Sequence, residues 1–291
     1  MFDEAINRAR DLDIERAKHP NDILPPFWGL PISLKDSFDI RGHDTSTGLA
    51  CYVNEPAKEN SSLAAMLLDL GAVLYCKSNL PQSIMTADSD NNVFGRTLNP
   101  QNAALTAGGS TGGEGALIAL RGSIVGVGTD IGGSLRVPAV CNGIYGFRPS
   151  AGVVPHDGVR NLTAHGNAGV RSSAGPMATS IRDCSLFLKT MMEGETWRYD
   201  STVTSLPWTY RPIKSKLRVG VVEDDGMFTP SPPVRRGLKL AMKLLRDSSQ
   251  FELVPMTLPN LKDHYYGLLQ YFSLSGSDVS HLWSKTSTMG R

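Results

Sequence analysis

The first part of the chain changes from one hydrophobic period to another. Over residues 1–18 apolar side chains recur at roughly helical spacing between charged residues, which predicts an amphipathic helix. Leu30, Ile32 and Leu34 then alternate with other residues, which is typical of a short strand. Lys35 would lie on the opposite face of this strand from the three apolar side chains.

The alternation of helical and strand patterns continues along the chain. Ser61 and Ser62 can cap a helix that reaches Leu70 and stops at Gly71, and the apolar run 72–76 behind it predicts a buried strand. Further segments are predicted as helices at 114–120, 134–140, 181–192 and 234–246, and as strands at 124–127, 217–222 and 252–254. Strands and helices that alternate in this way indicate a layered α/β fold.

Two stretches have no regular pattern. Segment 91–111 is rich in Asn, Gly and Thr and is predicted to be a loop, and the residues after Pro259 cannot be assigned. A chain of 291 residues has room for one large domain or two small ones, and we expect a single domain over 1–291. Its expected parts are a core at 25–192, a polar linker at 193–216 and a partial C-terminal segment at 217–291.

Composition and charge narrow the class of partner. Hydrophobic residues make up 41% and charged residues 20% of the chain, as in a globular protein that buries a core. The 29 basic and 28 acidic side chains leave a formal charge of +1, so the sequence predicts no broad field that would attract nucleic acid or an anionic membrane. A small molecule is therefore the expected partner.

The cysteines and the N-terminus bear on the compartment. The four cysteines are far apart and form no CxxC pair, so neither a disulfide framework nor a structural zinc site is expected. Free thiols suit a reducing compartment. The N-terminus lacks the apolar stretch of a signal peptide, and no apolar run is long enough to span a membrane. These features together predict a cytosolic location.

Two glycine-rich segments, 107–115 and 126–136, are the first candidates for chemistry. Dense glycine allows tight turns whose backbone N–H groups form a cradle for negative charge, either a phosphate or the oxyanion of a tetrahedral intermediate. The phosphate interpretation lacks support, because no Lys follows the glycines as in a P-loop. Ile131 also stands where the third glycine of GxGxxG would be needed.

A serine nucleophile fits these segments better. Ser134 follows Gly132 and Gly133 at the start of a predicted helix, where consecutive amides could point at one oxygen. A serine needs a base, and neither segment contains a histidine. A buried lysine can serve if burial keeps it neutral, which makes Lys35 a candidate.

Three motifs together resemble the amidase signature family. They are Gly29-Leu-Pro-Ile-Ser-Leu-Lys35-Asp36, Gly-Gly-Ser110-Thr-Gly-Gly-Glu-Gly115 and Gly128-Thr-Asp-Ile-Gly-Gly-Ser134-Leu-Arg136. They occur in the family's order and near its usual spacing. The residue sequence of segment 86–100 looks most like that of fungal acetamidases and general amidases, and the resemblance extends to 175–178 and 225–230.

The resemblance implies a fold and a reaction. The fold is a mixed central β-sheet flanked by helices in α/β/α layers. The reaction is hydrolysis of a carboxylic acid amide to an acid plus ammonia or an amine, through an acyl-enzyme and without a cofactor or metal. Lys35 matches the base, Ser110 the bridging serine held by a cis peptide bond, and Ser134 the nucleophile.

The resemblance also implies roles around this triad. The amides of Ile131, Gly132, Gly133 and Ser134 match the oxyanion hole. Ile84 matches a position that lines the acyl pocket. Asp130 and Arg136 match residues that brace the turn, and we expect them to form an ion pair.

Alternatives stay open beside this interpretation. The chain is shorter than members of the family at both ends, so we expect an incomplete fold, and a truncated, weakly active or inactive homologue is the main alternative. A partner-dependent subunit of amidotransferase type and a homo-oligomer are others. Gly108–Gly112 also fits the GxSxG elbow of α/β-hydrolases, which would need an Asp–His pair such as Asp225 and His264, but no hydrophobic strand precedes it.

Overall fold

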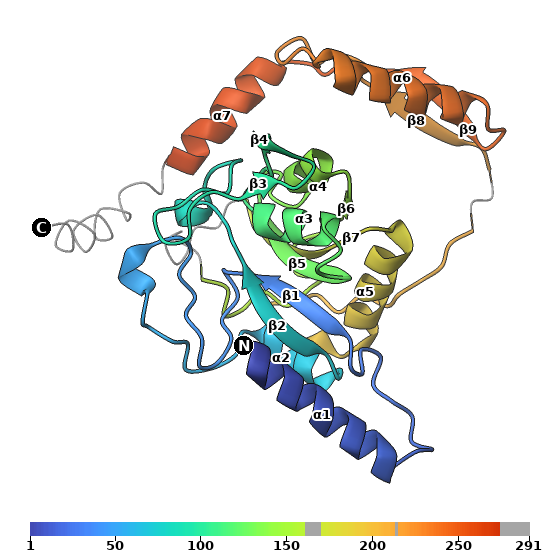
Figure 1. Ribbon diagram of the computed structural model, residues 1–291. Helices are drawn as coiled ribbons and strands as arrows, with labels where there is room; N and C mark the ends of the chain where they lie inside the picture. Colours follow the sequence, from blue (N-terminus) through green and yellow to red (C-terminus); the bar gives the residue numbers. More distant parts are fainter. Residues whose placement is uncertain (161–169, 213–214, 274–291) are drawn as a thin grey trace, which may run out of the picture. The chain divides into compact units, whose positions relative to one another are not determined.

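The computed structural model describes residues 1–160, 170–212 and 215–273 (Figure 1). Contacts group the chain into two compact units, one formed by Met1–Trp208 and the other by Thr209–Ser280, of which residues up to 273 are described. The expected division into a core, a linker and a C-terminal segment of one domain over 1–291 stays a prediction.

A five-stranded mixed sheet forms the centre of the first unit. Its strands lie in the order β2 (Val73–Ser78), β1 (Pro31–Lys35), β5 (Val125–Asp130), β7 (Ser173–Ala178) and β6 (Tyr145–Gly146). The pairs β2–β1 and β1–β5 are parallel, and β7 is antiparallel to both β5 and β6. The predicted α/β class and mixed sheet are therefore confirmed.

Helices cover both faces of this sheet, as Figure 1 shows. On one face, Ile32 and Leu34 of β1 lie in the same buried cluster as residues of α2 (Ser62–Asp69) and α5 (Ile181–Glu193). On the other face, Met177 of β7 packs against α3 (Gly112–Ala119) and α4 (Arg136–Asn142). Because side chains alternate along a strand, Ser33 and Lys35 of β1 point to the face of α3.

The N-terminal helix α1 (Phe2–Lys18) lies along the edge strand β2. Ala5 and Leu12 form a small buried cluster with Val73 of that strand. The predicted cap of α2 is also present, because the Ser61 hydroxyl accepts a hydrogen bond from the Ala64 amide. Hydrophobic period and capping residue therefore predicted these helices correctly.

Two parts of the first unit differ from the sequence prediction. The expected loop 91–111 contains a short hairpin, β3 (Leu98–Asn99) and β4 (Asn102–Thr106), whose turn is closed by the Asn99 side chain accepting from the Gln101 amide. Strand β7 was not predicted either. Its residues are buried on both faces, so they carry no alternation that would indicate a strand. Short 3-10 helices lie at Ala50–Tyr52, Gln82–Ile84 and Thr196–Arg198.

The second unit is a parallel strand–helix–strand with one further helix. The sequence predicted the order of strand β8 (Leu217–Val221), helix α6 (Pro232–Arg246) and strand β9 (Phe251–Pro255). The structure adds that β8 and β9 pair in parallel. The residues after Pro259, which showed no clear pattern, include the helix α7 (Leu261–Ser273).

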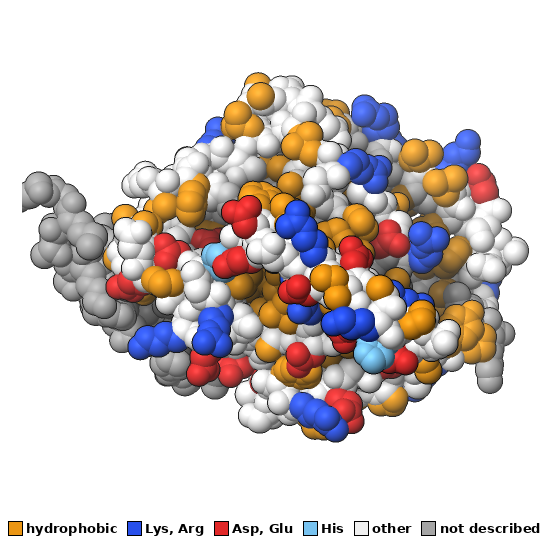
Figure 2. All heavy atoms as spheres, turned by 60° about the horizontal axis from the view of Figure 1, so that its bottom comes forward, with side chains coloured by type: hydrophobic (Ala, Val, Ile, Leu, Met, Phe, Trp, Pro, Cys, Tyr) orange, Lys and Arg blue, Asp and Glu red, His pale blue; other side chains and the backbone are white. Residues whose placement is uncertain are grey.

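Charges of both signs share the surface. Figure 2 shows a face on which Lys and Arg side chains lie among Asp and Glu side chains, in keeping with the formal charge of +1. Within the described ranges, no helix combines the length and the apolar character needed to cross a bilayer.

Candidate active site

Lys35 ends strand β1 with its side chain fully buried. Its Nζ lies 2.6 Å from the Ser110 hydroxyl and 3.0 Å from the Thr129 hydroxyl of β5. Burial favours the uncharged amine and lowers the pKa of Lys35 to about 7, although the carboxyl groups of Asp130 and Glu114 act in the opposite direction. A lysine in this state can accept a proton near neutral pH.

The loop that carries Ser110 is held from several sides. The Gly109–Ser110 peptide bond is cis, as the resemblance implied, and Ser110 is fully buried. The Ser89 hydroxyl donates to the Gly108 carbonyl at 2.9 Å and accepts from the Gly112 amide at 2.9 Å, so it braces both ends of the loop. These contacts keep Ser110 directed at Lys35.

Ser134 lies in the turn between β5 and α4. The predicted helix 134–140 begins later than expected, at Arg136, so Ser134 precedes the first helical residue. The Thr111 amide donates to the Ser134 carbonyl at 3.2 Å, which brings this turn beside the Ser110 loop. Ser134 is half-buried, and its hydroxyl forms no hydrogen bond with any residue that the structure describes.

The backbone amides of this turn divide into engaged and free groups. The Gly133 amide donates to the Asp130 carboxylate at 2.7 Å, and Gly133 has a φ of +127°, which favours glycine. The amides of Ile131, Gly132 and Ser134 have no acceptor among the described residues. Of the four amides that the resemblance assigns to the oxyanion hole, that of Gly133 is therefore already bound by the carboxylate of Asp130.

The predicted ion pair between Asp130 and Arg136 is confirmed. The Arg136 guanidinium donates to both carboxylate oxygens of Asp130 at 3.0 Å, and the Leu135 amide donates to one of them at 3.1 Å. Burial would raise the pKa of Asp130, but these hydrogen bonds and that of Gly133 lower it below its ordinary value. Asp130 is thus an anion that shapes the turn.

Ile84 adopts an uncommon backbone conformation. Its φ is +65°, and that of Ser83 is +62°, a region that β-branched residues rarely occupy. The Ser83 amide donates to the Thr47 carbonyl at 3.1 Å, which helps to hold this conformation. A Cβ on Gly109 would lie 2.6 Å from the Thr86 carbonyl, so the segment after Ile84 packs directly on the Ser110 loop.

Sequence analysis missed several polar groups near Lys35. Glu114 is fully buried on α3 and binds the hydroxyls of Ser33 and Ser78, and Thr129 binds Lys35 itself. Glu114 is the one charged residue of an otherwise apolar helix, a signal that could have marked it as buried and partnered. No comparable pattern marks Thr129.

A family model described as Amidase matches residues 1–286. This chain belongs to the amidase signature family. An amidase of Gibberella moniliformis is 43% identical over 263 residues, which cover 90% of this chain and 49% of that protein. An acetamidase of Emericella nidulans is 42% identical over 251 residues, which cover 84% of this chain and 45% of that protein.

Solved structures give the same family. A fatty acid amide hydrolase matches with a TM-score of 0.89 and 34% identity, covering 96% of this chain and 51% of that one. The expected amidase signature fold is therefore confirmed for the part that this chain contains. The chain spans about half the length of the curated relatives that it matches.

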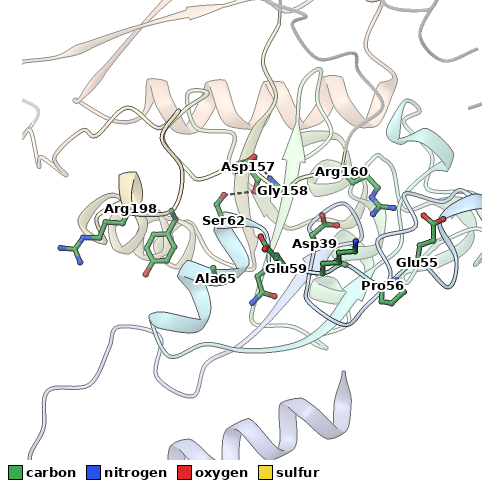
Figure 3. Close-up of a pocket in the computed structure, with 14 residues that line it drawn as sticks. Asp39, Glu55, Pro56, Glu59, Ser62, Ala65, Asp157, Gly158, Arg160 and Arg198 are labelled. Atoms are coloured by element: carbon green, nitrogen blue, oxygen red, sulfur yellow. Dashed lines mark hydrogen bonds between the residues drawn. The ribbon is translucent and has the colours of Figure 1, made fainter. Parts of the chain in front are cut away.

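A hollow of about 970 Å³ lies elsewhere on the first unit, and Figure 3 shows the residues around it. Its lining combines acidic residues such as Asp39 and Glu59 with Arg160 and Arg198, and includes none of Lys35, Ser110 and Ser134. The hollow is therefore separate from the candidate active site. Within the described residues, no group of three or more His, Cys, Asp or Glu side chains could hold a metal ion.

Proposed function

We propose that this amidase signature chain hydrolyses a carboxylic acid amide through Ser134, Ser110 and Lys35. The observation that carries the proposal is the contact of 2.6 Å between Lys35 Nζ and Ser110 Oγ inside a fully buried environment. Such burial supports a neutral amine, which is the form that a general base requires. The hydrogen bond from Thr111 to Ser134 supports the approach of the third residue.

In the first half-reaction, Ser134 acts as the nucleophile. Its proton passes to Ser110 Oγ while the proton of Ser110 passes to Lys35 Nζ, and Ser134 Oγ bonds to the amide carbonyl carbon. The negative oxygen that forms is stabilised by the three free amides of the turn, those of Ile131, Gly132 and Ser134.

The protons then return along the same path, which completes the first half-reaction. Lys35 gives its proton back through Ser110 to the leaving nitrogen, the C–N bond breaks, and ammonia or an amine departs. In the second half-reaction, water attacks the acyl carbon while Lys35 and Ser110 again remove a proton. The bond from the acyl carbon to Ser134 Oγ breaks, the proton returns through Ser110 to Ser134, and the acid is released. Asp130 and Arg136 keep the turn in place throughout, and Ile84 would border the acyl group.

The test is the variant Ser134→Ala in an amide-hydrolysis assay with a panel of aliphatic and aryl amides. We expect activity to fall at least about a thousandfold, because the oxyanion donors alone cannot replace the nucleophile. A fluorophosphonate should label the wild-type chain but not this variant. The exposed Ser201→Ala variant serves as the matched control and should be labelled normally.

Retained turnover or labelling in Ser134→Ala would refute the triad. A wild-type chain that is folded but inactive would support the alternative of a weakly active or inactive homologue, and recovery of activity with a co-purified protein would support the partner-dependent subunit. A cytosolic location and a homo-oligomer stay predictions, which cell fractionation and sedimentation would test.

A further inference from the structure

The fully buried carboxyl group of Glu114 lies against the strand that ends in Lys35. Glu114 projects from α3, and its two oxygens contact the hydroxyls of Ser33 at 2.5 Å and Ser78 at 2.7 Å. Ser33 is also 2.8 Å from the Ser123 hydroxyl. The carboxyl group and three serines therefore form one connected polar cluster in the interior.

Counting hydrogens in this cluster assigns a proton to Glu114. Each serine hydroxyl has a single hydrogen to donate. When the hydrogen of Ser123 is directed at the Val125 carbonyl, 2.9 Å away, Ser123 is the acceptor in its contact with Ser33. With Ser33 donating to Ser123, the contact of 2.5 Å between Ser33 and Glu114 is a hydrogen bond only if the carboxyl group supplies the hydrogen.

Strand β5, which pairs with β1, makes room for this carboxyl group. Ser33 pairs with Gly126 of β5, and a Cβ on Gly126 would overlap Glu114 Oε2 and lie 2.8 Å from Ser33 Oγ. A glycine in a strand interior weakens the strand unless something occupies the space. The site is thus built around a carboxyl group that no step of the proposed reaction uses.

The titratable groups that face Glu114 are Lys35 from β1 and Tyr75 and Cys76 from β2. Asp130 from β5 faces Lys35. Burial raises the pKa of Glu114 to about 7, although the contacts with the hydroxyls of Ser33 and Ser78 and the charge of Lys35 act in the opposite direction. Burial also raises the pKa values of Tyr75 and Cys76 to about 12, so neither of these carries charge near neutral pH.

Lys35 has one further titratable neighbour. It is His156, whose pKa burial lowers to about 4, so that it too is neutral. The protonation of Glu114 therefore decides whether Lys35 has one anionic neighbour, Asp130, or two. A second carboxylate close by would favour the protonated amine, which is the inactive form of a base.

We propose that Glu114 is a positioning residue for Lys35. The series of hydrogen bonds through Ser33 and Ser123 holds Glu114 as a neutral acid, and this leaves Lys35 free to act as the base. The inference rests on the proposed function, because Lys35 has to be the base of the reaction. Glu114 itself touches neither the substrate nor the reacting atoms.

The variant Ser123→Ala tests the direction of the hydrogen bonds between Glu114, Ser33 and Ser123. Without Ser123 as its acceptor, Ser33 can turn its hydrogen toward Glu114, and a hydrogen bond of that direction favours the carboxylate. The carboxylate then favours protonated Lys35, so the acid limb of kcat/KM should move to higher pH by about half a unit or more. In the double variant Ser123→Ala/Glu114→Gln this shift should disappear relative to Glu114→Gln alone.

Two results of the kinetic test would overturn the proposal. One is an acid limb that stays in place in Ser123→Ala, and the other is a shift that persists when residue 114 is Gln. A merely structural role would change the urea midpoint of these variants without moving the pH profile. An acid limb of Glu114→Gln that lies a full unit below that of the wild type would show that Glu114 is an anion in the wild type, which also contradicts the proposal.

An infrared measurement decides the protonation state without turnover. The difference spectrum between Ser134→Ala and Ser134→Ala/Glu114→Gln at pH about 6, below the pKa of about 7, should contain the C=O band of a carboxylic acid. Carboxylate bands alone would overturn the proposal. If Ser134→Ala instead retained activity, the proposed function would fail, while the infrared spectrum would still report Glu114 by itself.

Discussion

Gly126 offers the sharpest test of how the interior near Lys35 is built. In the variant Gly126→Ala the new methyl group would lie 2.8 Å from both the Glu114 carboxyl carbon and Ser33 Oγ, and it would overlap Glu114 Oε2. Real Cβ contacts are essentially never closer than about 3 Å, so the carboxyl group has to move. Moving it breaks its hydrogen bonds to Ser33 and Ser78.

The expected cost of Gly126→Ala follows from these two effects. Overpacking a closed core costs about 1–3 kcal/mol. Leaving a buried polar group without its partner costs about 1–3 kcal/mol more. We therefore expect the free energy of unfolding to fall by about 2–6 kcal/mol, a large part of the 5–15 kcal/mol that a domain typically has.

Urea unfolding followed by fluorescence and circular dichroism measures this loss. Gly132→Ala is the matched control for stability, because a Cβ there has no atom within 4 Å, and we expect a change within about 0.5 kcal/mol. The double variant Gly126→Ala/Glu114→Ala should lose less than the sum of the single variants, because removing the carboxyl group makes room. A wild-type midpoint for Gly126→Ala, or full additivity in the double variant, would refute the reasoning.

Three other variants or conditions test the remaining parts of the site. Activity should rise with pH up to about 7 and then level off, because the lowered pKa of Lys35 makes the amine neutral above that value; Lys35→Arg should be inactive throughout, and a flat wild-type profile would contradict this. Asp130→Asn should lower kcat by about 100-fold or more, because the turn that carries the oxyanion donors loses its anionic support. It should also move the acid limb of the pH profile to lower pH, because Lys35 loses an anionic neighbour, and an unchanged profile would contradict this prediction. Ser61→Ala should lower the free energy of unfolding by about 1 kcal/mol, since its hydroxyl caps α2, and circular dichroism melts that match the wild type would exclude this.

The predicted elements show where sequence patterns suffice. The helices α1, α2, α5 and α6 were recognisable because hydrophobic period, and for α2 the cap at Ser61, are local properties. Strand β7 was missed because both of its faces are buried, which removes the alternation on which a strand prediction depends. The hairpin at 98–106 was hidden for the opposite reason, since its strands are short and largely exposed.

The candidate site divides in the same way. The three motifs named Lys35, Ser110 and Ser134 as candidates. The ion pair of Asp130 with Arg136 could also be predicted, because the two residues are close in sequence and face each other across one turn. Sequence analysis could not find that the Gly133 amide is already bound by Asp130, nor that Glu114 lies beside Lys35. The first depends on the geometry of the folded turn, and the second on contacts between residues about 80 positions apart in the sequence.

The sequence by itself determined the family and the α/β class, and it named the candidate side chains for the chemistry. Only the tertiary structure decided their protonation. Lys35 binds hydroxyls 75 and 94 residues away in sequence, and Ser33 binds a carboxyl group 81 residues away. The pKa of a buried group depends on the loss of water and on such neighbours, which the chain brings together only when it folds.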